Sequence, residues 1–204
     1  MGADENSTAE RVRKRVKRIP KGHPFTLRRF NHVGELSRGA IGKAVARLVQ
    51  SGELERVFRG VYMRPKVSRH IGKVRPSAIA IAQMLAREKG HLLQIHGAEA
   101  VRHLGLSTQM QIQPIYYTSG PNQVIRVGNS TVRLVHKPAI QLQHTGTKVG
   151  IALTALFYMG KKEGTNPQVV AAIKKQLSPD ELHKLSESRM PIWMRKAFAS
   201  LKSH

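Results

Sequence analysis

The pattern of apolar and polar positions between residues 37 and 50 predicts an amphipathic helix. At about 100° per residue, one side of this helix is apolar and is formed by Ile41, Ala44, Val45, Leu48 and Val49. The other side is small or polar and is formed by Gly39, Lys43, Ala46, Arg47 and Gln50. Ser37 is a suitable N-cap and Gly52 a suitable terminator, so the sequence specifies both ends of the helix.

A short basic hairpin is predicted directly after this helix. Residues 53–58 and 61–65 are its strands and Arg59-Gly60 its turn. Upstream, residues 25–33 are expected to form a support helix with Thr26 as its N-cap, and residues 34–36 the turn that follows it. This order is typical of a winged helix-turn-helix, in which a helix enters the major groove and the hairpin touches the DNA backbone beside it.

The polar side of the helix suits contact with DNA. Gly39, Gly42 and Ala46 would allow the helix to approach a groove closely, since they carry little or no side chain. The long side chains on this side, which can reach base edges or phosphates, are Lys43, Arg47 and Gln50. The alternative is an ordinary surface helix with a solvated basic face.

The segments on either side of this region are strongly basic. Residues 1–7 are expected to be a disordered leader, and residues 8–19 a helix that ends before Pro20. Its Arg13, Lys14 and Lys17 either contact phosphates or are simply solvated. Residues 67–76 lie between prolines without clear periodicity and are interpreted as a basic linker. These boundaries give a DNA-binding domain at residues 8–66.

Residues 77–204 are expected to form a second, mixed domain, which makes the fold class α+β. A small antiparallel sheet is predicted from residues 112–118 and from a hairpin of residues 123–127 and 130–136. In that hairpin, Arg126 and Arg133 share one face and are further candidates for phosphate contacts, while Ile125 lies opposite Val132 on the other. Helices are predicted at residues 77–88, 96–104, 145–159, 167–177 and 179–188. Trp193 is expected to hold the C-terminal segment against the core.

Composition indicates a polyanionic partner. The 204 residues include 35 Lys and Arg and 12 Asp and Glu, a net charge of +23. Residues 1–75 hold 19 of the basic and 6 of the acidic residues. Such a field attracts DNA, RNA or an anionic membrane surface alike. No apolar run is long enough to span a bilayer and no signal peptide is recognisable, so a cytoplasmic protein without a membrane partner is expected.

The sequence offers no convincing catalytic, cofactor or metal site. Cysteine is absent, and His96 and His103 have no third ligand at a useful spacing, which favours structural or solvent roles for both. The stretch from Ser119 to Asn122 lacks the Gly-Lys-Ser/Thr of a phosphate loop and is interpreted as a turn. Tyr117, with its neighbour Tyr116, either stacks on a base or packs in the sheet. We therefore expect no enzyme.

The order of several short blocks resembles AbiEi-type antitoxins of bacterial type IV toxin-antitoxin systems. The resemblance spans roughly residues 10–195. The blocks are Arg59-Gly60-Val61-Tyr62 with Pro65, Pro76-Ser77, Gly97-Ala98, Leu104-Gly105-Leu106-Ser107-Thr108-Gln109, Tyr117-Thr118-Ser119-Gly120-Pro121 and Val127-Gly128.

This resemblance implies an N-terminal winged helix-turn-helix that represses the system's own promoter at inverted repeats. It also implies a C-terminal domain that neutralises a nucleotidyltransferase-like toxin, by direct contact or by opposing its action. It supports DNA contacts from the residues Arg38, Lys43, Arg47, Arg56 and Arg59, and assigns none to toxin neutralisation. An inverted repeat requires two copies of the chain, hence a possible dimer on DNA. Two alternatives remain: an RNA-binding or ribosome-associated protein, and a nucleic-acid-directed enzyme.

Overall fold

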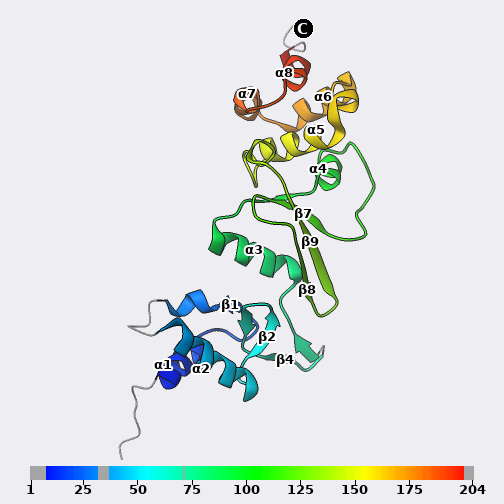
Figure 1. Cartoon of the computed structure of the whole chain (residues 1–204). Helices are drawn as coiled ribbons and strands as arrows, with labels where there is room; N and C mark the ends of the chain where they lie inside the picture. Colours follow the sequence, from blue (N-terminus) through cyan, green and yellow to red (C-terminus); the bar gives the residue numbers. More distant parts are fainter. Residues whose placement is uncertain (1–7, 32–36, 71, 200–204) are drawn as a thin grey trace, which may run out of the picture. The chain divides into compact units, whose positions relative to one another are not determined.

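Short helices and short strands alternate along the chain and give an α+β fold, as the sequence predicts. The computed structural model describes residues 8–31, 37–70 and 72–199, and within these ranges it has eight α-helices and three small sheets (Figure 1). The predicted leader at residues 1–7 and the predicted turn at residues 34–36 lie outside the described residues.

The N-terminal elements have an order and a sheet topology compatible with a winged helix-turn-helix. The elements are α1 (Thr8–Lys17), β1 (Pro24–Thr26), the 3-10 helix η1 (Leu27–Phe30), α2 (Arg38–Gln50), β2 (Glu55–Phe58) and β3 (Val61–Met63). The three strands form one antiparallel sheet in the order β1-β3-β2. The strand that follows α1 thus pairs with the hairpin that follows α2.

A small apolar core holds these elements together. The predicted apolar side of α2 is confirmed, because its four central side chains are buried: Ile41, Ala44, Val45 and Leu48. They pack in one cluster with Val12 and Val16 of α1 and with Phe25 and Phe30, whose ring centroids are 5.9 Å apart. The ends of α2 also follow the prediction. The Ser37 hydroxyl accepts a hydrogen bond from Ala40 N at 3.2 Å, and Gly52 takes a left-handed conformation with φ of 77°.

The support helix predicted at residues 25–33 is wrong in its first part. Phe25 lies in β1 and pairs with Tyr62 of β3, so the ladder between distant segments overrides the local helical pattern. Thr26 does act as an N-cap, but of the short η1, where its hydroxyl accepts a hydrogen bond from Arg28 N at 3.3 Å.

The segment predicted as an irregular basic linker contains a two-stranded hairpin. Its strands are β4 (Lys66–Ser68) and β5 (Gly72–Val74), which pair antiparallel. Each strand has only three residues, which is too short for a periodicity to be visible in the sequence. In the fold, hydrogen bonds between the two strands pair their backbone N–H and C=O groups.

The chain divides into two compact units. The first, here called the N-terminal unit, holds the described residues up to Met84 together with residues 125–131. The second, the C-terminal unit, holds residues 85–124 and those from 132 onward. The division passes through α3 (Ala78–Lys89), at whose start the Ser77 hydroxyl accepts a hydrogen bond from Ala80 N, as expected of a cap.

A four-stranded sheet has the order β6-β7-β9-β8. Its strands are β6 (Leu93–Ile95), β7 (Ile115–Thr118), β8 (Gln123–Val127) and β9 (Ser130–His136). The bounds of β8 and β9 are those predicted for the hairpin, and their burial alternates as expected, with Ile125 and Val132 buried and Arg126 and Arg133 exposed. The sheet is mixed rather than antiparallel, because β7 pairs with β9 in parallel. The parallel pairing follows from the strand order. After β7 the chain forms β8 at the edge of the sheet, turns back, and places β9 between β8 and β7.

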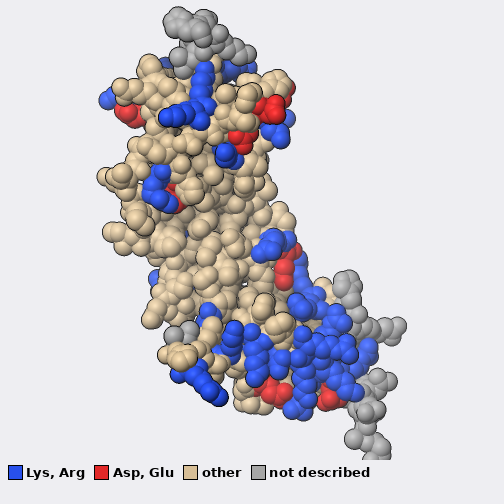
Figure 2. Space-filling view, turned by 180° about the vertical axis from the view of Figure 1, so that it is seen from behind, with Lys and Arg blue, Asp and Glu red and all other residues tan. Residues whose placement is uncertain are grey.

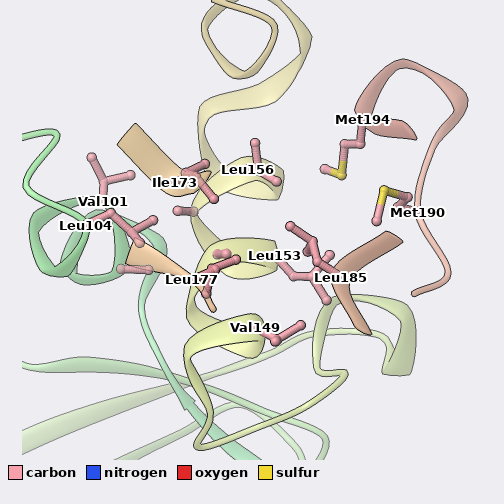
Figure 3. Close-up of a cluster of buried hydrophobic side chains, with 13 residues drawn as sticks. Val101, Leu104, Val149, Leu153, Leu156, Ile173, Leu177, Leu185, Met190 and Met194 are labelled. Atoms are coloured by element: carbon pink, nitrogen blue, oxygen red, sulfur yellow. The ribbon is translucent and has the colours of Figure 1, made fainter. Parts of the chain in front are cut away.

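The helices of the C-terminal unit pack around α5. They are α4 (Gly97–His103), α5 (Lys148–Gly164), α6 (Pro167–Gln176), α7 (Pro179–Glu187) and α8 (Ile192–Ala199), and the 3-10 helix η2 (Ala139–Gln141) precedes α5. Leu153 and Leu156 lie at the centre of the cluster in Figure 3, surrounded by side chains from the other helices. Trp193 is half-buried against this core, as predicted, and lies beside Gly164 of α5. The predicted starts of α6 and α7 are confirmed, and each of these helices begins with a proline.

Candidate nucleic-acid interface

The exposed side of α2 carries the residues predicted to contact DNA. Arg38, Lys43, Arg47 and Gln50 are all exposed, because the apolar side of the helix is fixed in the core. At about 100° per residue, Lys43 and Gln50 point in nearly the same direction and Arg47 lies beside them. Arg38 lies about 140° away from Lys43 around the helix, in its first turn. The fold therefore brings three of the four side chains together and leaves Arg38 apart.

Two glycines on this helix are not needed for its packing against the described residues. A Cβ atom built on Gly39 or on Gly42 meets no atom of those residues within 4 Å. Glycine within a helix costs about 0.5–1 kcal/mol relative to alanine. Both glycines lie in the first half of α2, where the described residues leave room for at least a methyl group.

The hairpin of β2 and β3 holds two exposed arginines beside α2. Arg56 lies in β2 opposite Tyr62, and the register shifts between Arg56 and Phe58. Arg59 stands at the turn, which Gly60 closes with φ of 74°. The Tyr62 ring packs on the Phe25 ring at a centroid distance of 6.2 Å. The hairpin is thus anchored to β1, while both arginine side chains remain exposed.

Of the basic residues predicted on α1, one is committed to an ion pair. Arg13 Nε donates a hydrogen bond to Glu53 Oε2 at 3.0 Å, and its Nη2 lies 2.9 Å from Glu53 Oε1. The hydrogen bond from Arg13 holds the pKa of the Glu53 carboxyl below its ordinary value. Lys14 and Lys17 are exposed on the same helix. Arg13 therefore ties α1 to the segment before β2, and Lys14 and Lys17 are better placed to contact phosphates.

The structure adds basic residues that the sequence analysis did not single out. Arg28 and Asn31 line a shallow depression together with Arg38 and Ile41, where η1 meets the start of α2. In the sequence, Arg28 lies within the predicted helix of residues 25–33 and no local pattern distinguishes it. Lys66 and Lys73 are exposed on the hairpin of β4 and β5. The sequence could have indicated these two lysines, because both lie near Gly72, a residue typical of turns.

Arg64 has a structural role instead. Its Nη1 donates hydrogen bonds to Lys17 O at 2.7 Å and to Ile19 O at 2.9 Å, at the end of α1. The sequence does not show this, because the partners lie more than forty residues upstream. A guanidinium at a helix C-terminus satisfies carbonyls that have no partner within the helix.

Positive charge dominates the N-terminal unit. The described residues between 8 and 75 include 19 Lys and Arg but only three acidic residues, Glu10, Glu53 and Glu55. Glu53 is paired with Arg13, and Glu55 with Arg75 at 2.6 Å. Lys and Arg gather in the lower part of Figure 2, over this unit. The two arginines predicted further along the chain, Arg126 and Arg133, are exposed on β8 and β9.

The candidate histidines have structural partners. His96 is the N-cap of α4, where its Nδ1 accepts a hydrogen bond from Ala98 N at 3.2 Å. His103 Nε2 lies 3.3 Å from Glu99 Oε1 on the same helix. Tyr117 is buried, so its ring is not presented as an open platform for a base. Within the described ranges, no three or more His, Asp or Glu side chains converge as metal ligands. In the same ranges, no helix has the length and apolar character needed to cross a bilayer.

Residues 11–185 match a protein family whose description is a family of unknown function (DUF6088). No curated protein matches the chain, and no solved structure does.

Proposed function

The chain belongs to a family of unknown function (DUF6088), and we propose that it is a sequence-specific DNA-binding protein that represses its own operon. Residues on α2 would read the bases, and α1 and the hairpin of β2 and β3 would bind the phosphates. The observation that carries the proposal is the exposed side of α2, where two glycines without an internal role lie among long basic side chains.

The dimensions of duplex DNA favour this use of α2. The major groove is about 12 Å wide and admits one helix, provided that the side of the helix facing the bases is not too bulky. Gly39 and Ala46 keep that side thin. Lys43 then reaches guanine acceptors and Gln50 reaches adenine, in keeping with the preferences of these side chains for bases.

The neighbouring elements supply contacts that do not depend on sequence. Four exposed cations lie on elements that share the apolar core of α2. They are Arg56 and Arg59 of the hairpin and Lys14 and Lys17 of α1. Contacts of this kind fix the position of a protein on the duplex and dominate its affinity, through the release of counterions.

The resemblance of the ordered blocks to AbiEi-type antitoxins supports a more specific role. We propose that the protein is the antitoxin of a type IV toxin-antitoxin system in the cytoplasm. Its C-terminal part would neutralise a nucleotidyltransferase-like toxin, and two copies would bind an inverted repeat in the promoter. The geometry of the N-terminal unit supports the DNA-binding half of this proposal only.

The first test is a titration of the purified protein against the duplex upstream of its own gene and against a shuffled duplex, at several salt concentrations. We expect a steep dependence on salt and a preference of about a thousandfold or more for the native sequence. An equally steep dependence without preference would refute the repressor. Tighter binding to structured RNA than to either duplex would favour an RNA-binding protein, and a rise in melting temperature with a divalent metal alone would favour an enzyme.

A further inference from the structure

The C-terminal unit contains a hollow to which DNA binding assigns no role. Tyr117 of β7, Lys137 after β9, Gln141 of η2 and three residues of α5 line it, namely Thr154, Phe157 and Tyr158. Its cavity volume is about 150 Å³, and it opens to solvent. Sites for small ligands are concave, largely apolar or aromatic, and contain a few polar groups that fix orientation. This hollow combines three aromatic side chains with a lysine, a glutamine and a threonine from segments far apart in the sequence, and the surface that it exposes is more polar than apolar.

The aromatic walls are held rigidly. The ring of His96 packs edge-on against Tyr117 at a centroid distance of 4.8 Å and against Tyr158 at 5.3 Å. Gly97 allows the close approach of Tyr158, because a Cβ atom at Gly97 would lie only 2.2 Å from Tyr158 Cβ. Tyr158 as a residue is nevertheless half exposed. Part of this lining residue of the hollow is therefore open to solvent.

One cation lies in this wall. Lys137 Nζ is 4.9 Å from the centroid of the Tyr117 ring. Lys137 forms no ion pair with a carboxylate among the described residues. The other polar linings, Gln141 and Thr154, are neutral. The Thr154 hydroxyl donates its hydrogen to Gly150 O at 2.7 Å, so its oxygen remains able to accept a hydrogen bond.

One buried amide nitrogen next to Tyr117 has no hydrogen-bond partner among the described residues, although the oxygen of the same amide accepts a hydrogen bond from Ile95 N at 3.2 Å. Gln94 pairs directly with Tyr117 across the sheet, so both side chains lie on the same face. Gln94 is 3% exposed, and its Nε2 donates no hydrogen bond within the described part of the chain. A buried amide in this state points to a water or a ligand that supplies an acceptor.

We propose that this hollow binds a small ligand that combines a planar aromatic ring with an anionic group, of the nucleoside monophosphate class. The Lys137 ammonium binds the phosphate, and the rings of Tyr158 and Phe157 contact the base. Gln141 and Thr154 supply neutral hydrogen-bonding groups for the base or the ribose. The proposal does not depend on DNA binding, since all these residues belong to the C-terminal unit.

Calorimetric titration of the full chain tests this site. The probes are the four ribonucleoside 5′-monophosphates, adenosine and inorganic phosphate, at about 150 mM salt to screen exposed charges. We expect at least one monophosphate to bind at one site per chain, more tightly than adenosine or phosphate. Lys137→Ala should weaken this binding about tenfold or more, as the loss of a charge-assisted hydrogen bond predicts. Lys137→Arg and Tyr158→Phe should retain it, and Tyr158→Ala should weaken it.

Two matched controls separate this site from the general basicity of the chain. Lys175→Ala removes an exposed lysine of the same unit, and Lys43→Ala one from the exposed side of α2. Neither should change monophosphate binding. Each variant is compared with the unaltered protein by thermal melting to show that it folds. The proposal is overturned if no monophosphate binds, if phosphate alone binds equally well, or if Lys43→Ala weakens binding as much as Lys137→Ala. Equal affinity of folded Lys137→Ala and the unaltered protein would overturn it as well.

Discussion

At Gly42 of α2, stability and the proposed DNA binding are expected to favour different side chains. A Cβ atom at Gly42 meets no atom of the described residues within 4 Å, so alanine fits there without a clash with them. Gly42→Ala should raise the free energy of unfolding by about 0.5–1 kcal/mol, because alanine loses less backbone entropy in a helix. Chemical denaturation measures this change.

The bulkier Gly42→Leu should keep the helix stable. It should weaken binding to the duplex upstream of the protein's own gene, here called the operator duplex, by about tenfold or more, since the added side chain separates α2 from the groove. Fluorescence anisotropy with labelled operator measures this loss. Operator affinity equal to that of the unaltered protein in Gly42→Leu would contradict the placement of this side of α2 against DNA.

A second residue links stability to pH. Burial, and to a smaller extent the charge of Lys137, lowers the pKa of His96 below its ordinary value of 6.5. The unfolded chain therefore takes up a proton at His96 at a higher pH than the folded protein does. The contribution of neutral His96 to the free energy of unfolding is complete above pH about 6.5. It is lost as the pH falls from there through the lowered pKa of the folded protein.

His96→Asn isolates this effect, because asparagine is a good N-cap that does not titrate. Denaturant midpoints between pH 8 and 5 should fall less steeply in this variant than in the unaltered protein, whatever its absolute stability. Parallel curves for the two proteins would assign the pH dependence to other groups.

At the level of elements, α2 and the hairpin of β2 and β3 are expected to contribute differently to DNA binding. Lys43→Ala should weaken operator binding by about 1–3 kcal/mol and leave binding to random duplex less affected, if its side chain contacts a base. Arg59→Ala should weaken both to a similar extent, because a phosphate contact carries no sequence information. Competition titrations with both duplexes measure the difference. A uniform loss in Lys43→Ala would reassign it to the phosphates.

At the level of the whole molecule, net charge should determine the dependence on salt more than any single contact. Each phosphate contact on duplex DNA contributes about −0.9 to the slope of log Kobs against log salt concentration. Removal of both Lys14 and Lys17 should therefore make the slope less steep by about 1.8. Arg13→Ala is the matched control on the same helix, since Arg13 already pairs with Glu53. A slope unchanged by loss of the two lysines would place α1 away from the DNA.

Much of the fold was predictable from the sequence where local patterns are long enough. The helix at α2 has a complete apolar side and two caps, and the hairpin of β8 and β9 has alternation on both sides of a Gly-Asn turn. The exposure of the candidate DNA-binding residues follows from the same patterns, because a helix with one apolar side must expose the other. Their role on DNA stays a prediction.

The errors fall where distant segments decide local structure. Phe25 lies in a strand because Tyr62 pairs with it, and β7 runs parallel to β9 because of the order of strands in the sheet. No local window of the sequence contains these partners. The commitment of Arg13 to Glu53, forty residues away, was hidden for the same reason.

The sequence by itself determined the positive charge, the α+β class and the amphipathic helix with its basic side, because these depend on composition and on short-range periodicity. Only the tertiary structure decided which cations remain exposed and which are held in ion pairs. It alone brought Lys137, Tyr117 and Tyr158 together around one hollow. The physical reason is that side chains from separate elements meet only after the backbone has packed, and their distances then depend on every element between them.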